Sequence, residues 1–457
     1  MPVREKFDFL DQLFTFLEPT KINQLAKETG FIQRKRKLDA NDFLSLLFGI
    51  HGNLVDHSLQ ELSTKCAVNQ EIEISRAALD KKFTKAAVLF LQRLVSELLD
   101  TERILSLTRH PLSEDWPFTT LRVLDGTHDA VPDLMLKKVQ KTRQTSVKIQ
   151  HEYDLLTGRA TFLRIDLQNV NDTISGAQRI PFLSANELCL QDLGYFHLKS
   201  FESIREKESY FLTRFRSDAY LAVVNPSPKY HPNGKKVESS RYLRVDLVAL
   251  SRAMDPNEII ELEEVYFGRD SHFQARCILF HQDQDQKEKR LLKIERRASR
   301  SRTPMRPIVR DLAGTTGYMT NLPDSISPKQ LVELYRLRWQ IEWEFRTLKS
   351  FLGLDHFRLM KQERWLCHVY GTLLIFLLSQ LMACQLRNAI WEEEKKEISE
   401  AIAIRCFACH FIPKMYEALR QKKTPQAFIP LITRLLTRTA RKPNSAMGTA
   451  MKRLQFK

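Results

Sequence analysis

The chain has 457 residues, of which 43% are hydrophobic and 28% are charged, with only 14 glycines and 18 prolines. This composition excludes a disordered, collagen-like or low-complexity chain, and the length suffices for several domains. Lysine and arginine total 71 against 55 aspartate and glutamate residues, which gives a net charge of +16. Such an excess indicates a polyanionic partner, either nucleic acid or an anionic membrane surface.

The cysteines and the apolar segments bear on the compartment. Seven cysteines spread over the chain are more typical of reduced thiols in the cytosol than of a disulfide framework. The first residues, MPVREKFDFLDQLF, carry charges where a signal peptide needs an apolar core, so we expect no export. The apolar stretch 369–386 contains polar residues such as Gln380. We therefore interpret it as the buried helix of a large core and expect a cytoplasmic protein without a membrane span.

Residues 1–110 have the apolar spacing of helices. Ser58 with Glu61 forms a capping-box pattern that opens a helix ending near Cys66. Ser75 opens a second predicted helix that runs towards Leu99 and carries lysines. Two helices around a short turn fit a DNA-reading helix-turn-helix. They fit equally well an ordinary helical pair with a solvated basic face.

From about residue 118 the apolar pattern changes from helical to strand-like. A strand at 121–124 ends at Asp125, and a later short strand at 189–190 ends at Asp192. The other elements expected in this region are a hairpin of strands at 146–153 and 160–167, helices at about 174–186 and 198–207, and a strand at 210–216. This mixture predicts an α/β domain.

Residues from about 217 to 315 contain short β-like runs and turns, which predict a mainly β insertion. The far end of this segment is strongly basic, and a charge run is usually a solvated face or loop. Because most of the opposing charge is missing, we predict a surface that contacts DNA phosphates. The residues expected to make these contacts are Lys293, Arg296, Arg297 and Arg300.

A helix is predicted to begin at Ser327-Pro328-Lys329-Gln330, which combines an N-cap serine, a first-turn proline and a capping box. It should run to about Phe351. At about 100° per residue, four polar residues share one narrow sector of this helix: Tyr335, Arg338, Glu342 and Lys349. A polar stripe on an otherwise apolar helix usually lines a site, although a solvated stripe gives the same pattern.

The spacing Tyr335-x2-Arg338-x3-Glu342-x6-Lys349 resembles the YREK signature of the insertion-sequence-four family of bacterial DDE transposases. That family also has an aspartate at the end of its first core strand, matched here by Asp125-Gly126-Thr127. A second aspartate lies in a D-x-G-Y-like motif, matched by Asp192-Leu193-Gly194-Tyr195. The resemblance covers roughly residues 30 to 390.

The resemblance implies an α/β fold with an RNase H-like catalytic core, a mixed sheet flanked by helices. A helical N-terminal domain at 1–110 would bind DNA ends. The core would occupy 118–353 and would be interrupted by the β-rich basic insertion at about 217–315. A helical C-terminal region at 354–457 would complete the core and could mediate dimerisation.

Three carboxylates provide the chemistry that DNA cleavage requires. Two divalent ions can align a nucleophile against a phosphodiester and neutralise its charge, and Mg²⁺ prefers a few carboxylates together with phosphate oxygens. Asp125, Asp192 and Glu342 would therefore be both catalytic residues and ligands of two Mg²⁺ or Mn²⁺ ions. By resemblance, the residues near the scissile phosphate would be Tyr335, Arg338 and Lys349.

The sequence thus predicts a cut-and-paste transposase of a bacterial insertion sequence. It would bind double-stranded terminal inverted repeats, pair them as a homodimer on DNA, cut them and join them to target DNA at the nucleoid. The alternatives are an RNase H-like nuclease or resolvase, and a non-cutting DNA-binding regulator derived from a transposase. Some family members stack a tryptophan of the insertion on a flipped base. This chain has no tryptophan between Trp116 and Trp339, and Tyr318 or a phenylalanine or tyrosine of the insertion is a candidate substitute.

Overall fold

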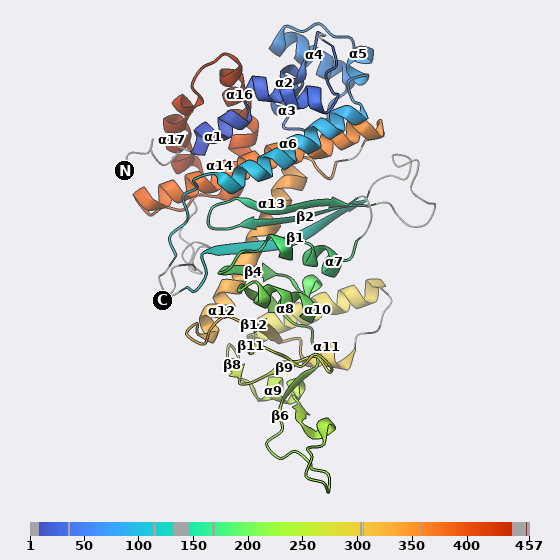
Figure 1. The fold of residues 1–457 in the computed structure, drawn as a ribbon, viewed down its shortest axis with the longest axis vertical. Helices are drawn as coiled ribbons and strands as arrows, with labels where there is room; N and C mark the ends of the chain where they lie inside the picture. Colours follow the sequence, from blue (N-terminus) through green and yellow to red (C-terminus); the bar gives the residue numbers. More distant parts are fainter. Residues whose placement is uncertain are drawn as a thin grey trace. The chain divides into compact units, whose positions relative to one another are not determined.

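The computed structural model describes residues 9–34, 37–112, 116–130, 146–166, 170–301, 304, 306–356, 358–440 and 454. The chain, whose ribbon is drawn in Figure 1, divides by its internal contacts into two compact units. The first unit comprises Met1–Pro111, Gly126–Val170 and Trp339–Lys452, and the second comprises Leu112–Asp125, Asn171–Arg338 and Arg453–Lys457. The predicted N- and C-terminal helical regions therefore belong to one and the same unit.

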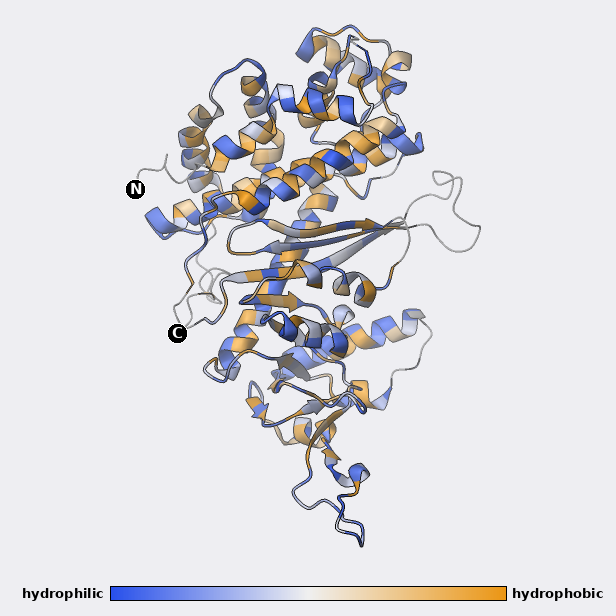
Figure 2. Cartoon of the chain, in the orientation of Figure 1, coloured by the Kyte–Doolittle hydropathy of each residue, from blue (hydrophilic) through white to orange (hydrophobic). Residues whose placement is uncertain are grey.

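The first unit is mainly helical. Its longest helices, α6 (Lys85–Ile104) and α14 (Gln362–Glu394), pack along each other through apolar residues that recur on both (Figure 2). By length and composition α14 could cross a membrane, but 89% of its most apolar window is buried inside the protein. The prediction of a buried helix at 369–386 is confirmed. The other helices are α1 (Phe9–Phe16), α2 (Pro19–Glu28), α3 (Ala40–Gly49), α4 (Leu59–Gln70), α5 (Arg76–Asp80), α15 (Glu400–Cys406), α16 (Ile412–Arg420) and α17 (Ile429–Thr439).

The predicted helix pair near the N-terminus is only half right. The capping box of Ser58 is present and opens α4. The single helix expected from Ser75 to Leu99 is instead two helices, α5 and α6, because buried Phe83 anchors the turn and Thr84 accepts a hydrogen bond from the Ala87 amide. Helix α5 has only five residues, so the second helix of the predicted pair is much shorter than expected.

Eight strands form the larger sheet. In the first unit the order is β3-β2-β1, and β2 (Ser146–Asp154) and β3 (Ala160–Asp166) form the predicted antiparallel hairpin. In the second unit the order is β1-β4-β5-β12-β11-β8, where β1, β4 and β5 are parallel and the last three are antiparallel. The bounds are β1 Thr120–Ala130, β4 Glu187–Gln191, β5 Tyr210–Arg214, β8 Ile259–Leu262, β11 Arg276–His281 and β12 Thr315–Thr320.

Helices pack on this sheet within the second unit. Helices α8 (Leu198–Glu206) and α12 (Pro328–Tyr335) both contact β5, and α7 (Asp172–Ala177) lies against the short turn that follows β4. The helix expected at 174–186 is shorter than predicted and continues as a 3-10 turn at Ile180–Phe182. A mixed sheet with flanking helices confirms the predicted α/β class.

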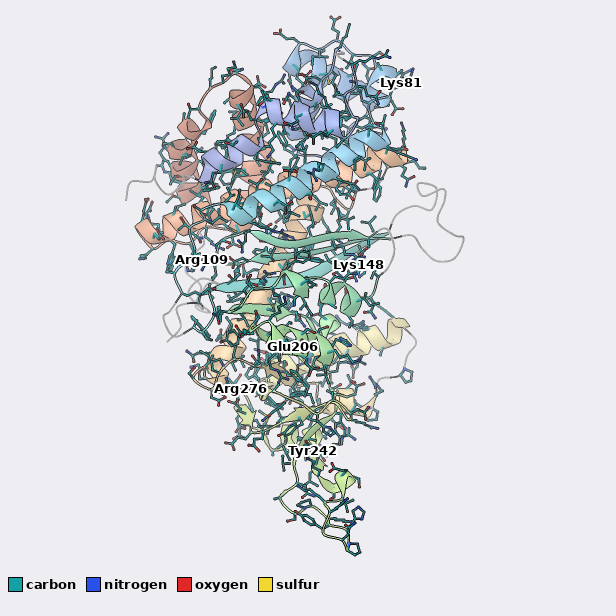
Figure 3. All side chains as sticks on the ribbon, in the orientation of Figure 1. Lys81, Arg109, Lys148, Glu206, Tyr242 and Arg276 are labelled. Carbon is teal, nitrogen blue, oxygen red and sulfur yellow. The ribbon has the colours of Figure 1, made fainter. Side chains whose placement is uncertain are left out.

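The segment 217–315 was predicted to be mainly β, and this prediction is wrong. Only a small sheet of order β10-β9-β6-β7 stands apart, whereas β8 and β11 extend the larger sheet. There the Arg276 side chain, labelled in Figure 3, contacts Glu261 at 2.6 Å. The basic run lies on an 18-residue helix, α10 (Gln284–Ser301). The remaining elements are β6 (Leu221–Val224), β7 (Tyr242–Arg244), β9 (Tyr266–Phe267), β10 (Phe273–Gln274), α9 (Leu247–Ala253) and α11 (Pro307–Asp311).

The helical run predicted to end at Phe351 has the expected extent but a varying pitch. Helix α12 is followed by a 3-10 turn at Arg336–Arg338, by α13 (Trp339–Arg346) and by a π-helical turn at Thr347–Phe351. The capping box at Ser327 is present and fixes the start. The predicted single sector of polar residues assumed a uniform α-helix. The angular positions of these residues differ from that prediction, because a 3-10 turn advances about 120° per residue rather than about 100°.

Candidate active site

Three polar residues occupy equivalent positions on adjacent parallel strands of the second unit. The pairing of β1 with β4 ends at Leu124 opposite Gln191, and that of β4 with β5 ends at Gln191 opposite Thr213. The next residues along the three strands are Asp125, Asp192 and Arg214. Residues in register on parallel strands project to the same face, and neighbouring strands lie about 4.8 Å apart. The register therefore brings these three side chains together.

The prediction that a strand ends at Asp125 is wrong in one respect, because β1 continues to Ala130. The pairing with β4 nevertheless stops at Leu124, so Asp125 still lies at the carboxyl end of the paired segment. Asp192 follows β4 directly, as predicted. The two aspartates thus lie at the edge of the parallel strands where α/β proteins place their sites.

Arg338 holds both aspartates. Its Nη1 atom donates to Asp125 Oδ2 at 3.4 Å, and its Nε atom lies 4.0 Å from Asp192 Oδ1. The Arg338 side chain is only 5% exposed, whereas the side chains of Asp125 and Asp192 are 23% and 35% exposed. A buried cation therefore lies behind two carboxylates that open to solvent.

Arg214, at the end of β5, is a site residue that the sequence did not single out. Its Nη2 atom donates to Asp192 Oδ1 at 2.7 Å. Burial alone would raise the pKa of the Asp192 carboxyl, but the charges of Arg214 and Arg338 and the hydrogen bond from Arg214 outweigh burial and lower it. Asp192 is therefore an ionised carboxylate at neutral pH. In the sequence Arg214 is marked only by its place at the end of an apolar strand run, which does not reveal that it lies beside Asp192.

Tyr335 lies behind this cluster rather than on its open side. Its buried hydroxyl donates to the Gln191 carbonyl at 3.3 Å, and the Arg214 guanidinium lies 5.8 Å from its ring centroid. Burial raises the pKa of Tyr335 to about 12, so the phenol stays a neutral hydrogen-bond donor. Tyr318 packs edge-on against Tyr335 at 5.2 Å and is 6% exposed. It therefore does not present a face on which a base could stack.

The remaining predicted site residues, Glu342 and Lys349, belong to the first unit. Glu342 lies on α13, four residues after Arg338 in the chain. Lys349 lies on the π-helical turn, and its Nζ donates to the carbonyl of His128 at 3.1 Å. Among the residues that the structure describes, no group of three or more His, Cys, Asp or Glu side chains is close enough to hold a metal ion.

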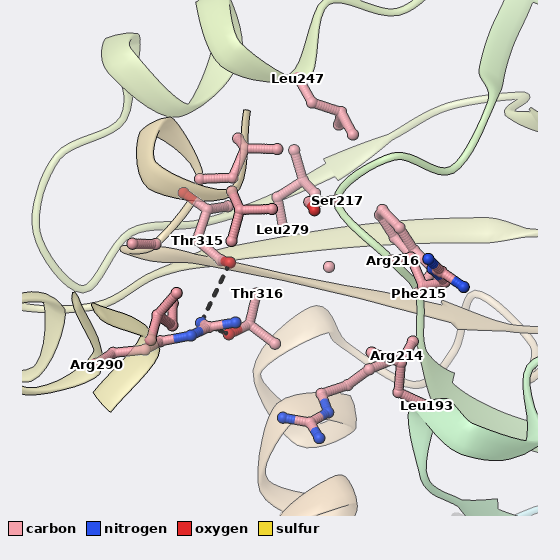
Figure 4. A pocket seen from close by; sticks show the side chains of 15 residues that line it. Leu193, Arg214, Phe215, Arg216, Ser217, Leu247, Leu279, Arg290, Thr315 and Thr316 are labelled. Atoms are coloured by element: carbon pink, nitrogen blue, oxygen red, sulfur yellow. Dashed lines mark hydrogen bonds between the residues drawn. The ribbon is translucent and has the colours of Figure 1, made fainter. Parts of the chain in front are cut away.

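One of the four predicted basic residues lines the same groove as Asp192. Arg297 of α10 lines a groove of about 890 Å³ together with Asp192. The lining of this groove does not include the other three, Lys293, Arg296 and Arg300. A neighbouring cavity of about 260 Å³ is lined by Arg214 and Arg290, among other residues (Figure 4). There Arg290 donates to Thr316 Oγ1 at 3.0 Å, and burial lowers its pKa.

Comparison with known proteins shows the family to which the chain belongs. Residues 116–378 match the model of the transposase DDE domain. The match covers more than half of the chain and includes both aspartates and the helix that carries Glu342. The chain belongs to the DDE transposases.

Known relatives are similar over nearly the whole chain. The transposase for insertion sequence element IS231F of Bacillus thuringiensis subsp. israelensis is 30% identical, with 94% of this chain and 89% of the relative covered. The transposase for IS1151 of Clostridium perfringens is 28% identical, with 90% and 86% covered. Among solved structures, the piggyBac transposase synaptic complex with hairpin DNA covers 97% of this chain and 87% of its own at 10% identity, with a TM-score of 0.49.

Proposed function

We propose that this DNA transposase cuts the ends of its insertion sequence with divalent metal ions held by Asp125, Asp192 and Glu342, and transfers the ends to target DNA. Support comes above all from the equivalent strand positions of Asp125 and Asp192 and from the guanidinium of Arg338 that both approach. Two carboxylates at equivalent positions of neighbouring strands provide oxygen ligands for a divalent cation, which would take the place of the Arg338 guanidinium beside them. Glu342, one helical turn after Arg338 in the chain, is the third ligand that we infer.

The donor set fits Mg²⁺ or Mn²⁺, which accept carboxylate oxygens together with phosphate oxygens and water. Two bound ions would neutralise phosphate charge and generate a nucleophile. The chain's own residues supply the rest. Arg214 and Arg338 keep Asp192 ionised, and the Tyr335 hydroxyl fixes the Gln191 carbonyl next to Asp192.

Cationic side chains near the carboxylates suit the phosphates of the substrate. Arg338 presents a planar fork and Lys349 a point charge, and both bind phosphate well. We infer that these two residues contact DNA near the scissile bond when metal has engaged the aspartates. Tyr335, predicted to contact DNA with them, is instead buried behind the cluster and supports it through the Gln191 carbonyl. Farther out, the predicted phosphate contacts of α10 would extend the bound path.

The assembly that we propose is a homodimer formed on DNA, because two ends must be cut and joined together. The helical region 1–110 would bind the terminal inverted repeats, and the protein would act at the bacterial nucleoid in the cytoplasm. The net charge of +16 supports an affinity for polyanions. Pairing is tested by the electrophoretic migration of complexes formed with ends of two different lengths, where a mixed complex indicates a dimer.

The proposed chemistry is tested by three single substitutions, Asp125→Asn, Asp192→Asn and Glu342→Gln. Each should reduce cleavage of DNA carrying the inverted repeats below detection while end binding persists, because cutting rests on metal ligands and binding on basic surfaces. Cleavage by the wild type should require Mg²⁺ or Mn²⁺ and stop with a chelator. Asp166→Asn is the matched control, since Asp166 closes β3 and pairs with Arg164 at 2.7 Å.

Retained cleavage in any of the three variants would remove that residue from the metal site. Specific end binding by the wild type without cleavage in any metal would instead favour the non-cutting regulator.

A further inference from the structure

The groove that Asp192 lines carries positive charges that the proposed catalytic residues do not explain. It has a volume of about 890 Å³, and three arginines contribute to its walls: Arg216, Arg297 and Arg306. Arg216 follows β5, Arg297 lies on α10, and Arg306 precedes α11. Three separate segments therefore converge on one concave basic surface, which we call the Asp192 groove.

Two of these arginines, Arg216 and Arg306, form ion pairs with one carboxylate, that of Asp218. Asp218 Oδ1 accepts from Arg216 Nε at 3.1 Å, and Asp218 Oδ2 accepts from Arg306 Nη1 at 2.9 Å. Burial would raise the pKa of Asp218, but the hydrogen bond from Arg306 and the charges of both arginines outweigh burial and lower it. Asp218 is thus an ionised carboxylate that forms ion pairs with two arginines inside the groove.

The pairing is open to competition. The side chains of Arg216 and Arg306 are 60% and 59% exposed, and that of Asp218 is 32% exposed. Ion pairs this exposed contribute little to stability and are screened by salt. A phosphodiester offers two anionic oxygens, the same arrangement that the Asp218 carboxylate offers, and guanidinium forks bind both.

We propose that the Asp192 groove binds the DNA strand beside the scissile phosphate through Arg216 and Arg306, and that Asp218 occupies these arginines until DNA displaces it. This inference rests on the proposed function, since it takes DNA as the ligand. Asp218 acts as a built-in competitor of phosphate. It weakens binding to any DNA that does not fill the groove.

The test is the salt dependence of DNA binding by the full chain, measured with end DNA for the wild type and Asp218→Asn. The substitution changes the charge of the cluster of two arginines and one aspartate from +1 to +2. One more net cation should steepen the slope of log K against log salt by about 0.9 and raise affinity about eightfold at 0.1 M salt. Asp324→Asn is the control, because Asp324 also lies 3.3 Å from an arginine but lines a different pocket.

Further variants separate the inference from simpler causes. Arg306→Gln alone should make the slope shallower by about 0.9, and in the Asp218→Asn background it should cancel the gain. Arg306→Gln also serves if Asp218→Asn fails to fold, which thermal unfolding would reveal. An unchanged slope in Asp218→Asn, or an equal gain in Asp324→Asn, overturns the inference. If that occurs while the wild type still cuts with metal, the proposed function stands; loss of end binding and cutting in the wild type would refute both.

Discussion

Replacing Arg338 by glutamine should uncover the repulsion between the two aspartates. In the wild type the Arg338 guanidinium lies 3.4 Å from Asp125 and 4.0 Å from Asp192. Glutamine has a similar polar end but no charge, so two carboxylates at equivalent positions of neighbouring strands would face each other with less compensation. Asp192 would retain Arg214 at 2.7 Å, whereas Asp125 would lose the guanidinium that donates to its Oδ2 atom.

The expected loss in the free energy of unfolding depends on how exposed the side chains of the ion pair are. Breaking a fully buried ion pair costs about 3–5 kcal/mol, and breaking an exposed one costs about 0–1 kcal/mol. Arg338 is 5% exposed but its partners are 23% and 35% exposed, so the free energy of unfolding should fall by about 1–3 kcal/mol. For a domain of 150–250 residues, each kcal/mol corresponds to about 2–4 °C in Tm.

Thermal unfolding with and without millimolar Mg²⁺ provides the assay. Mg²⁺ should raise the Tm of Arg338→Gln more than that of the wild type, because the ion no longer competes with a guanidinium for the carboxylates. The depressed pKa of Asp192 means that its stabilisation is present above the unfolded pKa of about 3.9 and is lost as pH falls through the folded pKa. The gap between the two proteins should therefore narrow below about pH 4.

Two outcomes would refute this reasoning. One is a metal-free Tm of Arg338→Gln equal to that of the wild type, and the other is an equal response of both proteins to Mg²⁺. Arg252→Gln is a suitable control, since Arg252 forms an exposed pair with Asp311 at 3.4 Å and should change the Tm little.

Three further predictions concern other parts of the chain. Arg338→Lys should bind ends almost as well as the wild type but cut them one to two decades more slowly in single-turnover assays, a cost of about 1–3 kcal/mol for the lost fork; wild-type rates would place Arg338 away from the phosphate. Glu102→Gln should raise stability by about 3 kcal/mol at pH 7, because burial raises the pKa of Glu102 to about 8. The folded state keeps Glu102 protonated, so the free energy of unfolding decreases as pH rises from about 4.5 through about 8. The Tm measured from pH 5 to 8 should therefore fall more in the wild type than in Glu102→Gln. The last variant changes four basic residues of α10 to glutamine: Lys293, Arg296, Arg297 and Arg300. The salt slope of DNA binding should then fall by about 3–4 units. An unchanged slope would mean that these residues form a solvated face.

The positions of Asp125 and Asp192 could be predicted because each follows a short apolar run, which is a local pattern. The role of Arg214 could not, because it depends on the register of three strands that are far apart in the sequence. The same holds for Asp218, whose partner Arg306 lies 88 residues away. Local sequence identifies the end of a strand, but it does not say which strands lie side by side.

Helices were predicted well where their ends are capped and poorly where their pitch or polarity is unusual. Ser327 fixes the start of α12, yet the 3-10 and π-helical turns that follow depend on packing and leave no mark in a 3.6-residue pattern. Helix α10 was expected as a basic loop or face within a β region, because its residues are mostly charged. Ile294 and Ala298, four residues apart, line the groove and are the weak signal of its packed side.

The discontinuity of the first unit has a consequence for the order of synthesis. Helix α6 packs against α14, and Gln92 of α6 donates to the Tyr370 hydroxyl at 2.8 Å. The ribosome completes α6 long before it reaches α14, so the apolar side of α6 lacks its partner until residues 112–125 and 171–338 of the second unit have been made. A product that terminates early would keep this side uncovered and would be prone to aggregation or proteolysis. Truncated copies of the gene would then fail to yield stable end-binding fragments, and only full-length chains would compete for the ends.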